Sequence, residues 1–102
     1  MKGTMTIKTT DGHSFVKELD RPPTLDELTK AVGGHIEFIP GFEHFMGNDA
    51  IAYCNEEGKL DGLPINESAT ALWEDQHQGI IDDVLVGNIV ILSGDEEFME
   101  AQ

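Results

Sequence analysis

The sequence predicts a small α+β domain, in which about five mostly antiparallel strands carry two short helices. Three observations support this class. Two alternating runs flank an Asp-Gly pair, a Thr-x-x-Glu motif opens an amphipathic stretch, and short apolar runs separated by Gly and Pro follow. The chain has 102 residues, which is enough for one domain with a modest core. We therefore expect residues 1–102 to form a single domain.

Residues 1–20 carry the signature of an N-terminal β-hairpin. Residues 4–9 and 13–18 alternate apolar and polar side chains on either side of Asp11-Gly12. An Asp-Gly pair between two alternating runs is a strong short-range hairpin signal. Two prolines after Arg21 then end the second strand. The side chains expected to point inward are Ile7, Phe15 and Val16.

The best-defined helix is predicted to begin after Thr24. Thr24 and Glu27 form a capping box, in which the threonine hydroxyl accepts from the Glu27 amide and the Glu27 carboxylate accepts from the Thr24 amide. Gly33-Gly34 supplies the stop. The apolar side chains at helical spacing are Leu25, Leu28 and Val32.

The remaining elements are shorter, and Gly, Pro and polar turns separate them. We expect strands at residues 35–39, ended by Pro40, and at 50–54, with a loop from Gly41 to Asp49 and a turn at 55–59. Asn66 or Ser68 caps a short helix that runs through Trp73, and a polar, mobile connection follows at 76–79. The last elements are a strand at 84–92, broken by a turn or bulge at Gly87-Asn88, and an acidic tail at 94–102, either frayed or a last helical turn.

The net charge of −14 is distributed unevenly along the chain. Residues 1–30 hold five basic and five acidic side chains, whereas residues 31–102 hold fifteen acids and one base, Lys59. Such a surface repels nucleic acids, phosphates and acidic membranes, and it attracts basic protein surfaces. We expect these charges to gather on one side of the domain, carried by the later turns, the second helix and the tail.

The composition also indicates a compartment. Cys54 is the only cysteine, which excludes an internal disulfide and fits a reducing environment. The N-terminus lacks the apolar core of a signal peptide, and no run approaches the roughly 18 apolar residues of a membrane span. We therefore expect a cytoplasmic protein without a membrane partner.

Patterns for catalysis or metal binding are weak. The four histidines lie near acids, but none has the spacing of a known zinc motif, so solvated surface histidines are the simpler interpretation. Cys54 lies in an apolar run, where cysteine commonly behaves as a small hydrophobe. We predict no enzyme activity, no catalytic residue, no metal and no cofactor.

Carboxylates at turns and element ends are the main candidates for contact with a partner. Duplex DNA carries one charge per about 1.7 Å, and a protein with spaced carboxylates can occupy the basic array that otherwise holds it; the simpler alternative is a solvated face that serves solubility. A second candidate is the Gly-flanked loop with Phe42, Phe45 and Met46, either an interface plug or, as we favour, a loop folded over the core. The candidate partner-binding residues are Glu56, Glu57, Glu74, Asp75, Asp82, Asp83, Phe42 and Phe45.

The middle of the chain resembles a known family. The residues that carry the likeness are Val32-Gly33-Gly34-His35-Ile36-Glu37, Asn55-Glu56-Glu57-Gly58-Lys59-Leu60, Leu63-Pro64-Ile65-Asn66 with Ala69-Thr70, and Val86-Gly87-Asn88-Ile89-Val90. Over residues 25–93 this pattern is similar to domain of unknown function 3846, a family of small proteins frequent in phages and mobile elements. The family has no agreed activity, so the resemblance implies a fold and a phage-like origin and no catalytic residue.

Charge and resemblance together suggest a function. We expect a small acidic phage or mobile-element protein, present in the host cytoplasm, that binds and inhibits a basic, nucleic-acid-handling host defence protein. An anti-CRISPR or antirestriction inhibitor would fit, acting as a nucleic-acid mimic without binding nucleic acid itself. The alternative is a non-inhibitory phage accessory or assembly module whose acids serve solubility. The sequence leaves open whether the protein forms a homodimer.

Overall fold

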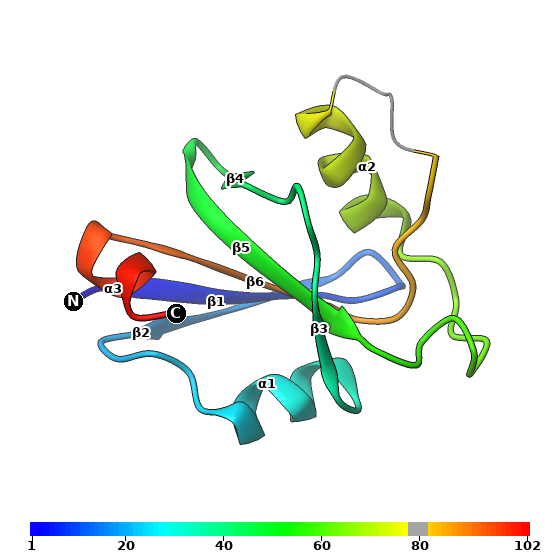
Figure 1. The fold of residues 1–102 in the computed structure, drawn as a ribbon, viewed down its shortest axis with the longest axis horizontal. Helices are drawn as coiled ribbons and strands as arrows, with labels where there is room; N and C mark the ends of the chain where they lie inside the picture. Colours follow the sequence, from blue (N-terminus) through cyan, green and yellow to red (C-terminus); the bar gives the residue numbers. More distant parts are fainter. Residues whose placement is uncertain (78–81) are drawn as a thin grey trace.

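The computed structural model describes residues 1–77 and 82–102 and contains one antiparallel sheet (Figure 1). The strand order is β2-β1-β6-β5-β3, and the short strand β4 pairs with the start of β5. The α+β class is therefore confirmed, with six strands and three helices among the described residues. The elements are β1 Gly3–Lys8, β2 Ser14–Leu19, α1 Leu25–Val32, β3 Ile36–Phe38, β4 His44–Phe45, β5 Asn48–Asn55, α2 Glu67–Gln76, β6 Ile89–Gly94 and α3 Glu96–Glu100.

Strand β6 is the centre of the fold, and helices cover the sheet on both faces. Its apolar run alternates between two core clusters, because successive side chains of a strand point to opposite faces. Ile89 and Ile91 join the cluster under α2, whereas Val90 and Leu92 join the cluster under α1 and α3. Figure 1 shows α2 above the sheet and α1 below it, with α3 at the left end. A continuous apolar strand is expected where both faces are buried.

The N-terminal hairpin is confirmed, but its inward side chains are not as predicted. β1 and β2 pair antiparallel, with Ile7 opposite Phe15 and Thr6 opposite Val16. Ile7 is half-buried, but Phe15 is 59% exposed and Val16 is 65% exposed, so for these two side chains the prediction is wrong. Neighbouring residues of a strand cannot share a face, and β2 is the outermost strand, while α1 packs on β3, β5 and β6.

Helix α1 follows its local signals closely. Both bonds of the capping box are present: the Thr24 amide donates to Glu27 Oε1 at 2.9 Å, and the Glu27 amide donates to Thr24 Oγ1 at 3.1 Å. Gly33 ends the helix with a left-handed φ of 81°. The buried face of α1 consists of Leu28, Ala31 and Val32. It differs from the predicted face in one residue, because Leu25 is 66% exposed and Ala31 is buried in its place.

The loop expected between Gly41 and Asp49 contains a small hairpin. β4 pairs with the first residues of β5, with Phe45 opposite Asn48. Met46 and Gly47, with φ of 53° and 81°, make the tight turn between them. The strand predicted at 50–54 therefore begins earlier, at Asn48.

The C-terminal third confirms one expectation and decides between the two alternatives of another. The strand predicted at 84–92 is interrupted as expected: Val86 forms an isolated bridge with Ile65, Gly87 turns with φ of 72°, and β6 follows. The acidic tail is a third helix, α3, which Asp95 caps by accepting from the Phe98 amide at 2.8 Å. Phe98 is fully buried, so the tail is anchored by a core side chain instead of frayed.

The connection predicted to be mobile at 76–79 is described only in its first half. The Gln76 side-chain oxygen accepts from the backbone amides of Glu43 and His44 at 2.6 and 2.8 Å, and His77 Nε2 lies 2.8 Å from the Gly41 carbonyl. Residues 78 and 79 lie outside the described residues. None of the described helices has the length and apolar character needed to cross a membrane.

Candidate functional site

A partly enclosed depression lies between α2, the β3 edge of the sheet and the turn after β5. Its volume of about 210 Å³ is below the roughly 300–1,000 Å³ of pockets for drug-sized ligands, so it suits a single side chain better than a cofactor. The lining residues are Glu37, Phe38, Ile39, Pro40, Cys54, Asn55, Glu56, Lys59, Leu60, Trp73, Asp83, Val84, Leu85 and Val86.

The floor of this cavity is apolar and is part of the core. Ile39, Trp73 and Leu85 are buried there, and the Trp73 indole Nε1 donates to the Pro40 carbonyl at 2.9 Å. Cys54 packs against the same cluster. Burial, followed by the nearby Glu37 carboxylate, raises the pKa of the Cys54 thiol above its ordinary value. The thiol is only half-buried, and a raised pKa favours its neutral form, which is a poor nucleophile.

The rim of the cavity is charged. Lys59 Nζ forms an ion pair with Asp83 Oδ1, and this bond, with a second from the Val84 amide, holds the pKa of Asp83 below its ordinary value. Lys59 is the only Lys or Arg in residues 31–102, and the ion pair with Asp83 offsets its charge. Glu37 and Glu56 are exposed on the same rim and leave it with net negative charge.

The turn that presents these acids is built on Asn55. The buried Asn55 side chain accepts from the Glu57 amide at 2.9 Å and donates to the Val32 carbonyl at 3.3 Å. The backbone carbonyl of Asn55 also accepts from the Gly58 amide at 3.1 Å. These bonds use the interior side of the turn, so the Glu56 and Glu57 side chains are left exposed to solvent.

The predicted acidic residues fall into two groups, one at the cavity and one at the end of α2. Glu56 and Asp83 line the cavity, Glu57 lies on the same turn, and Asp82 is the exposed neighbour of Asp83. Glu74 and Asp75 lie instead in the last turn of α2. Two further cavity residues, Glu37 and Lys59, were missed. Glu37 faces the site because it pairs directly with Cys54 across β3 and β5, and that register could not be inferred from either run alone.

The predicted aromatic contacts are not on this surface. Phe42 is 1% exposed and belongs to the core under α2, so it cannot contact a partner without unfolding. Phe45 is half-buried against the same cluster, with Lys8 Nζ 5.8 Å from its ring centroid. The favoured interpretation, a loop folded over the core, is therefore correct for both, and only Met46 at the turn is 82% exposed.

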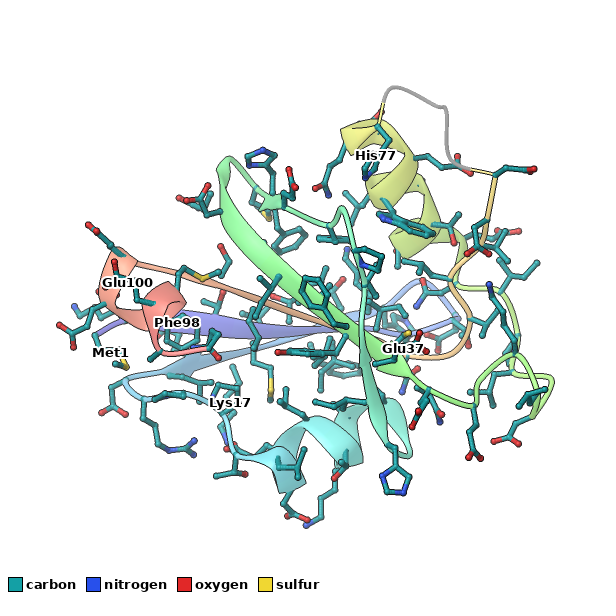
Figure 2. The ribbon with its side chains drawn as sticks, in the orientation of Figure 1. Met1, Lys17, Glu37, His77, Phe98 and Glu100 are labelled. Atoms are coloured by element: carbon teal, nitrogen blue, oxygen red, sulfur yellow. The ribbon has the colours of Figure 1, made fainter. Side chains whose placement is uncertain are left out.

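The expectation of one anionic face is wrong. Figure 1 places α3, with its acidic first turn, at one end of the long axis and the turn after β5 at the other. Figure 2 shows the same separation between Glu100 and Glu37. The acidic tail lies apart from the cavity because Phe98 docks it beside β1 and β6.

The sequence pattern that resembled a family includes residues that connect separate segments of the fold. Asn66 is fully buried: its amide nitrogen donates to the carbonyls of Lys8 and Gly87, both at 2.9 Å, and its oxygen caps α2 by accepting from the Ala69 amide at 3.1 Å. These residues therefore hold the architecture together. Within residues 1–77 and 82–102, no group of three or more His, Cys, Asp or Glu side chains is arranged to bind a metal.

Fold and site together define a small α+β domain with an acid-rimmed cavity. The chain matches the family model described as Domain of unknown function (DUF3846) over residues 1–101, and it belongs to this family. The match is longer than the 25–93 stretch recognised from motifs, in keeping with β1 and α3 being parts of the same sheet and core. Comparison with curated proteins and with solved structures found no match.

Proposed function

We propose that this protein is a non-catalytic binding protein, and that its cavity end docks onto a basic surface of a nucleic-acid-handling protein. The observation that carries the proposal is the anionic rim over an apolar floor. An Arg or Lys side chain matches both parts, because its aliphatic stem packs on apolar surface while its charged head binds carboxylates. Glu37 and Glu56 are the exposed carboxylates of that rim.

The finer part of the proposal is inhibition of a host defence protein by a phage or mobile-element product, of the anti-CRISPR or antirestriction type. A DNA duplex as long as the 36 Å axis of the molecule carries about 20 phosphate charges, which is of the same order as the net charge of −14. A protein of this size and charge can compete with a nucleic acid for a basic array. Spaced opposite charges also accelerate association.

A matched pair of variants tests the site. Glu56→Gln with Glu57→Gln removes two charges beside the cavity, and Glu96→Gln with Glu97→Gln removes two from α3. Pull-down from host lysate at low and high salt, followed by nuclease or DNA-binding assays of the captured protein, is the measurement. We expect capture and inhibition to be lost with the first pair and kept with the second, and to weaken as salt rises.

The second candidate is an accessory or assembly module whose acids serve solubility. The distribution of acids over both ends of the molecule favours it, because solubility needs no single face. In that case the two double variants behave alike, and neither changes capture. Partner binding that is unchanged between low and high salt would also contradict the proposal that the protein mimics a nucleic acid.

A further inference from the structure

Strand β2 forms one outer edge of the sheet and is uncovered on both faces. Residues 14–18 are all exposed, and only Leu19, at the end of the strand, is buried. The edge carries two adjacent apolar side chains, Phe15 at 59% and Val16 at 65% exposure. An edge strand of six residues with exposed apolar side chains is a template for pairing with another strand.

The hairpin register shows which backbone groups of β2 are free to pair. The Thr9 amide donates to the His13 carbonyl at 3.0 Å, so these two residues form a hydrogen-bonded pair. Hydrogen-bonded and non-hydrogen-bonded pairs alternate along an antiparallel ladder. Phe15 and Lys17 therefore direct their N–H and C=O groups toward β1. The outward backbone groups belong to Ser14, Val16 and Glu18.

We propose that β2 is a self-association edge, at which a second copy of this chain adds its own β2 antiparallel about a two-fold axis through Val16. This axis sets Val16 opposite its own counterpart and Ser14 opposite the partner's Glu18. All the outward N–H and C=O groups of the strand then meet complementary groups. The interface closes as a dimer, because a two-fold contact uses the same edge of both copies.

The side chains fit the same register. Phe15 comes opposite the partner's Lys17 on the face of the sheet that carries α1, an arrangement suited to a cation–π contact. Figure 2 shows Lys17 on the side of the sheet where α1 lies, and its Nζ is 3.0 Å from Glu27 Oε2. On the other face, Val16 packs against its counterpart, so both exposed apolar residues of the edge become covered.

Charge explains why a second copy fits this edge better than the opposite one. The segment that contains β2, residues 1–30, has equal numbers of acids and bases, whereas the rest of the chain carries the net charge of −14. The opposite edge, β3, has three residues with Glu37 at its centre and Glu56 nearby. Two such edges would place like charges together, so the neutral edge is the one that identical anionic chains can share.

The test is sedimentation velocity of the full chain over a concentration series at low and high salt. Wild type is expected to form dimers, more strongly at high salt, because salt screens repulsion between two acidic chains. Val16→Pro removes an outward N–H and breaks no bond to β1, and edge strands tolerate proline at such positions. We expect it to raise the dimer Kd about tenfold or more, whereas the control Val16→Thr keeps the N–H and a β-branched side chain and leaves the dimer in place.

Hydrogen exchange on wild type needs no variant and covers the case in which Val16→Pro does not fold. The amides of Ser14, Val16 and Glu18 should gain protection as protein concentration rises, while the amide of Gly47, in a distant turn, should not. A wild type that stays monomeric to about 1 mM at high salt would overturn the proposal. So would a dimer insensitive to Val16→Pro, open-ended aggregates, or protection that appears only with a different protein bound.

The salt response separates this edge from the cavity end. Dimerisation is expected to strengthen with salt, whereas binding to a basic partner is expected to weaken. Glu56→Gln with Glu57→Gln should not weaken the dimer, because it removes no contact of β2 and lowers the repulsion between the two chains. Failure of the basic-partner proposal would therefore leave the dimer result standing, and the reverse also holds.

Discussion

The two edges of the sheet differ in length, cover and charge. β2 has six residues, of which the first five are exposed, and it lies in a neutral segment. β3 has three, and it ends beside a cavity whose rim holds Glu37, Glu56 and the Lys59–Asp83 pair. Short strands and charges are the common means of keeping an edge from pairing with another strand. The comparison indicates that one edge is closed to strand pairing and suited to a charged partner, and that the other is open to a strand.

The largest expected effect comes from Asn66, which joins the end of β1 to the turn before β6 through the Lys8 and Gly87 carbonyls. Asn66→Ala removes one buried and one part-buried hydrogen bond and the α2 cap, which should lower the free energy of unfolding by about 3 kcal/mol. Urea unfolding followed by Trp73 fluorescence measures it. The control is Asn88→Ala, which loses one 3.4 Å bond to the Ala31 carbonyl and should cost under about 1 kcal/mol. Equal losses in the two variants would show that the Asn66 bonds to Lys8 and Gly87 contribute no more than the single bond of Asn88.

Trp73 tests the β3 side alone. Trp73→Phe removes the bond to the Pro40 carbonyl and part of the cavity floor, so we expect a loss of about 1.5 kcal/mol in unfolding free energy. Circular dichroism can follow the unfolding of this variant. Tyr53→Phe, on the opposite face of the sheet, is the control and should stay within about 0.5 kcal/mol of wild type. If Trp73→Phe also weakens the dimer, the two edges are coupled and the comparison fails.

Salt should act on the whole molecule through its uncompensated acids. Raising sodium chloride from about 0.05 to 0.5 M should increase the free energy of unfolding by on the order of 1 kcal/mol, because self-repulsion is screened. Surface ion pairs such as Arg21–Glu27 weaken with salt, but pairs of this kind contribute little. Urea unfolding at several salt concentrations measures the change. A fall in stability with salt would mean that attractive pairs outweigh the net charge of −14.

The smallest effect is expected at Glu27, which ties the end of the β2 region to α1. Hydrogen bonds from Arg21, the Thr24 amide and Lys17 hold the pKa of Glu27 well below its ordinary value. A carboxyl with a lowered folded pKa stabilises the fold above its ordinary pKa, and this contribution is lost as pH falls through the folded value. The Tm difference between wild type and Glu27→Gln should therefore be full at neutral pH and shrink in acid. Glu100→Gln, on α3, is the control; a gap that widens in acid would contradict the assignment.

Local signals predicted the parts of the fold that depend on neighbouring residues. Three features were predicted correctly because each depends on contacts within a few residues: the Asp11-Gly12 turn, the Thr24–Glu27 capping box and the helix stop at Gly33. The acidic tail was not readable in this way. Asp95 caps α3 locally, but Phe98 is buried against Gly3 and Gly94, and the contact with Gly3 spans nearly the whole chain.

The candidate site followed the same division. Glu56 and Asp83 were selected for their place at turns, and they line the cavity. Glu37 and Lys59 were missed because their role depends on the register of β3 with β5 and on the ion pair across to Asp83. Phe42 was uncertain because a Gly-flanked apolar loop can cover a core or project from it, and only the position of α2 decides between them.

The sequence by itself determined the class of fold, the hairpin, the first helix and an excess of acids confined to residues 31–102. Caps, turns and net charge are properties of short segments, so they can be read without knowing which strands are neighbours. Tertiary structure alone decided that β2 is an open edge, that Phe15 and Val16 face solvent, and that the acids divide between two ends. The physical reason is that exposure depends on strand order and helix placement, and here β1 must pair with β6, more than eighty residues away.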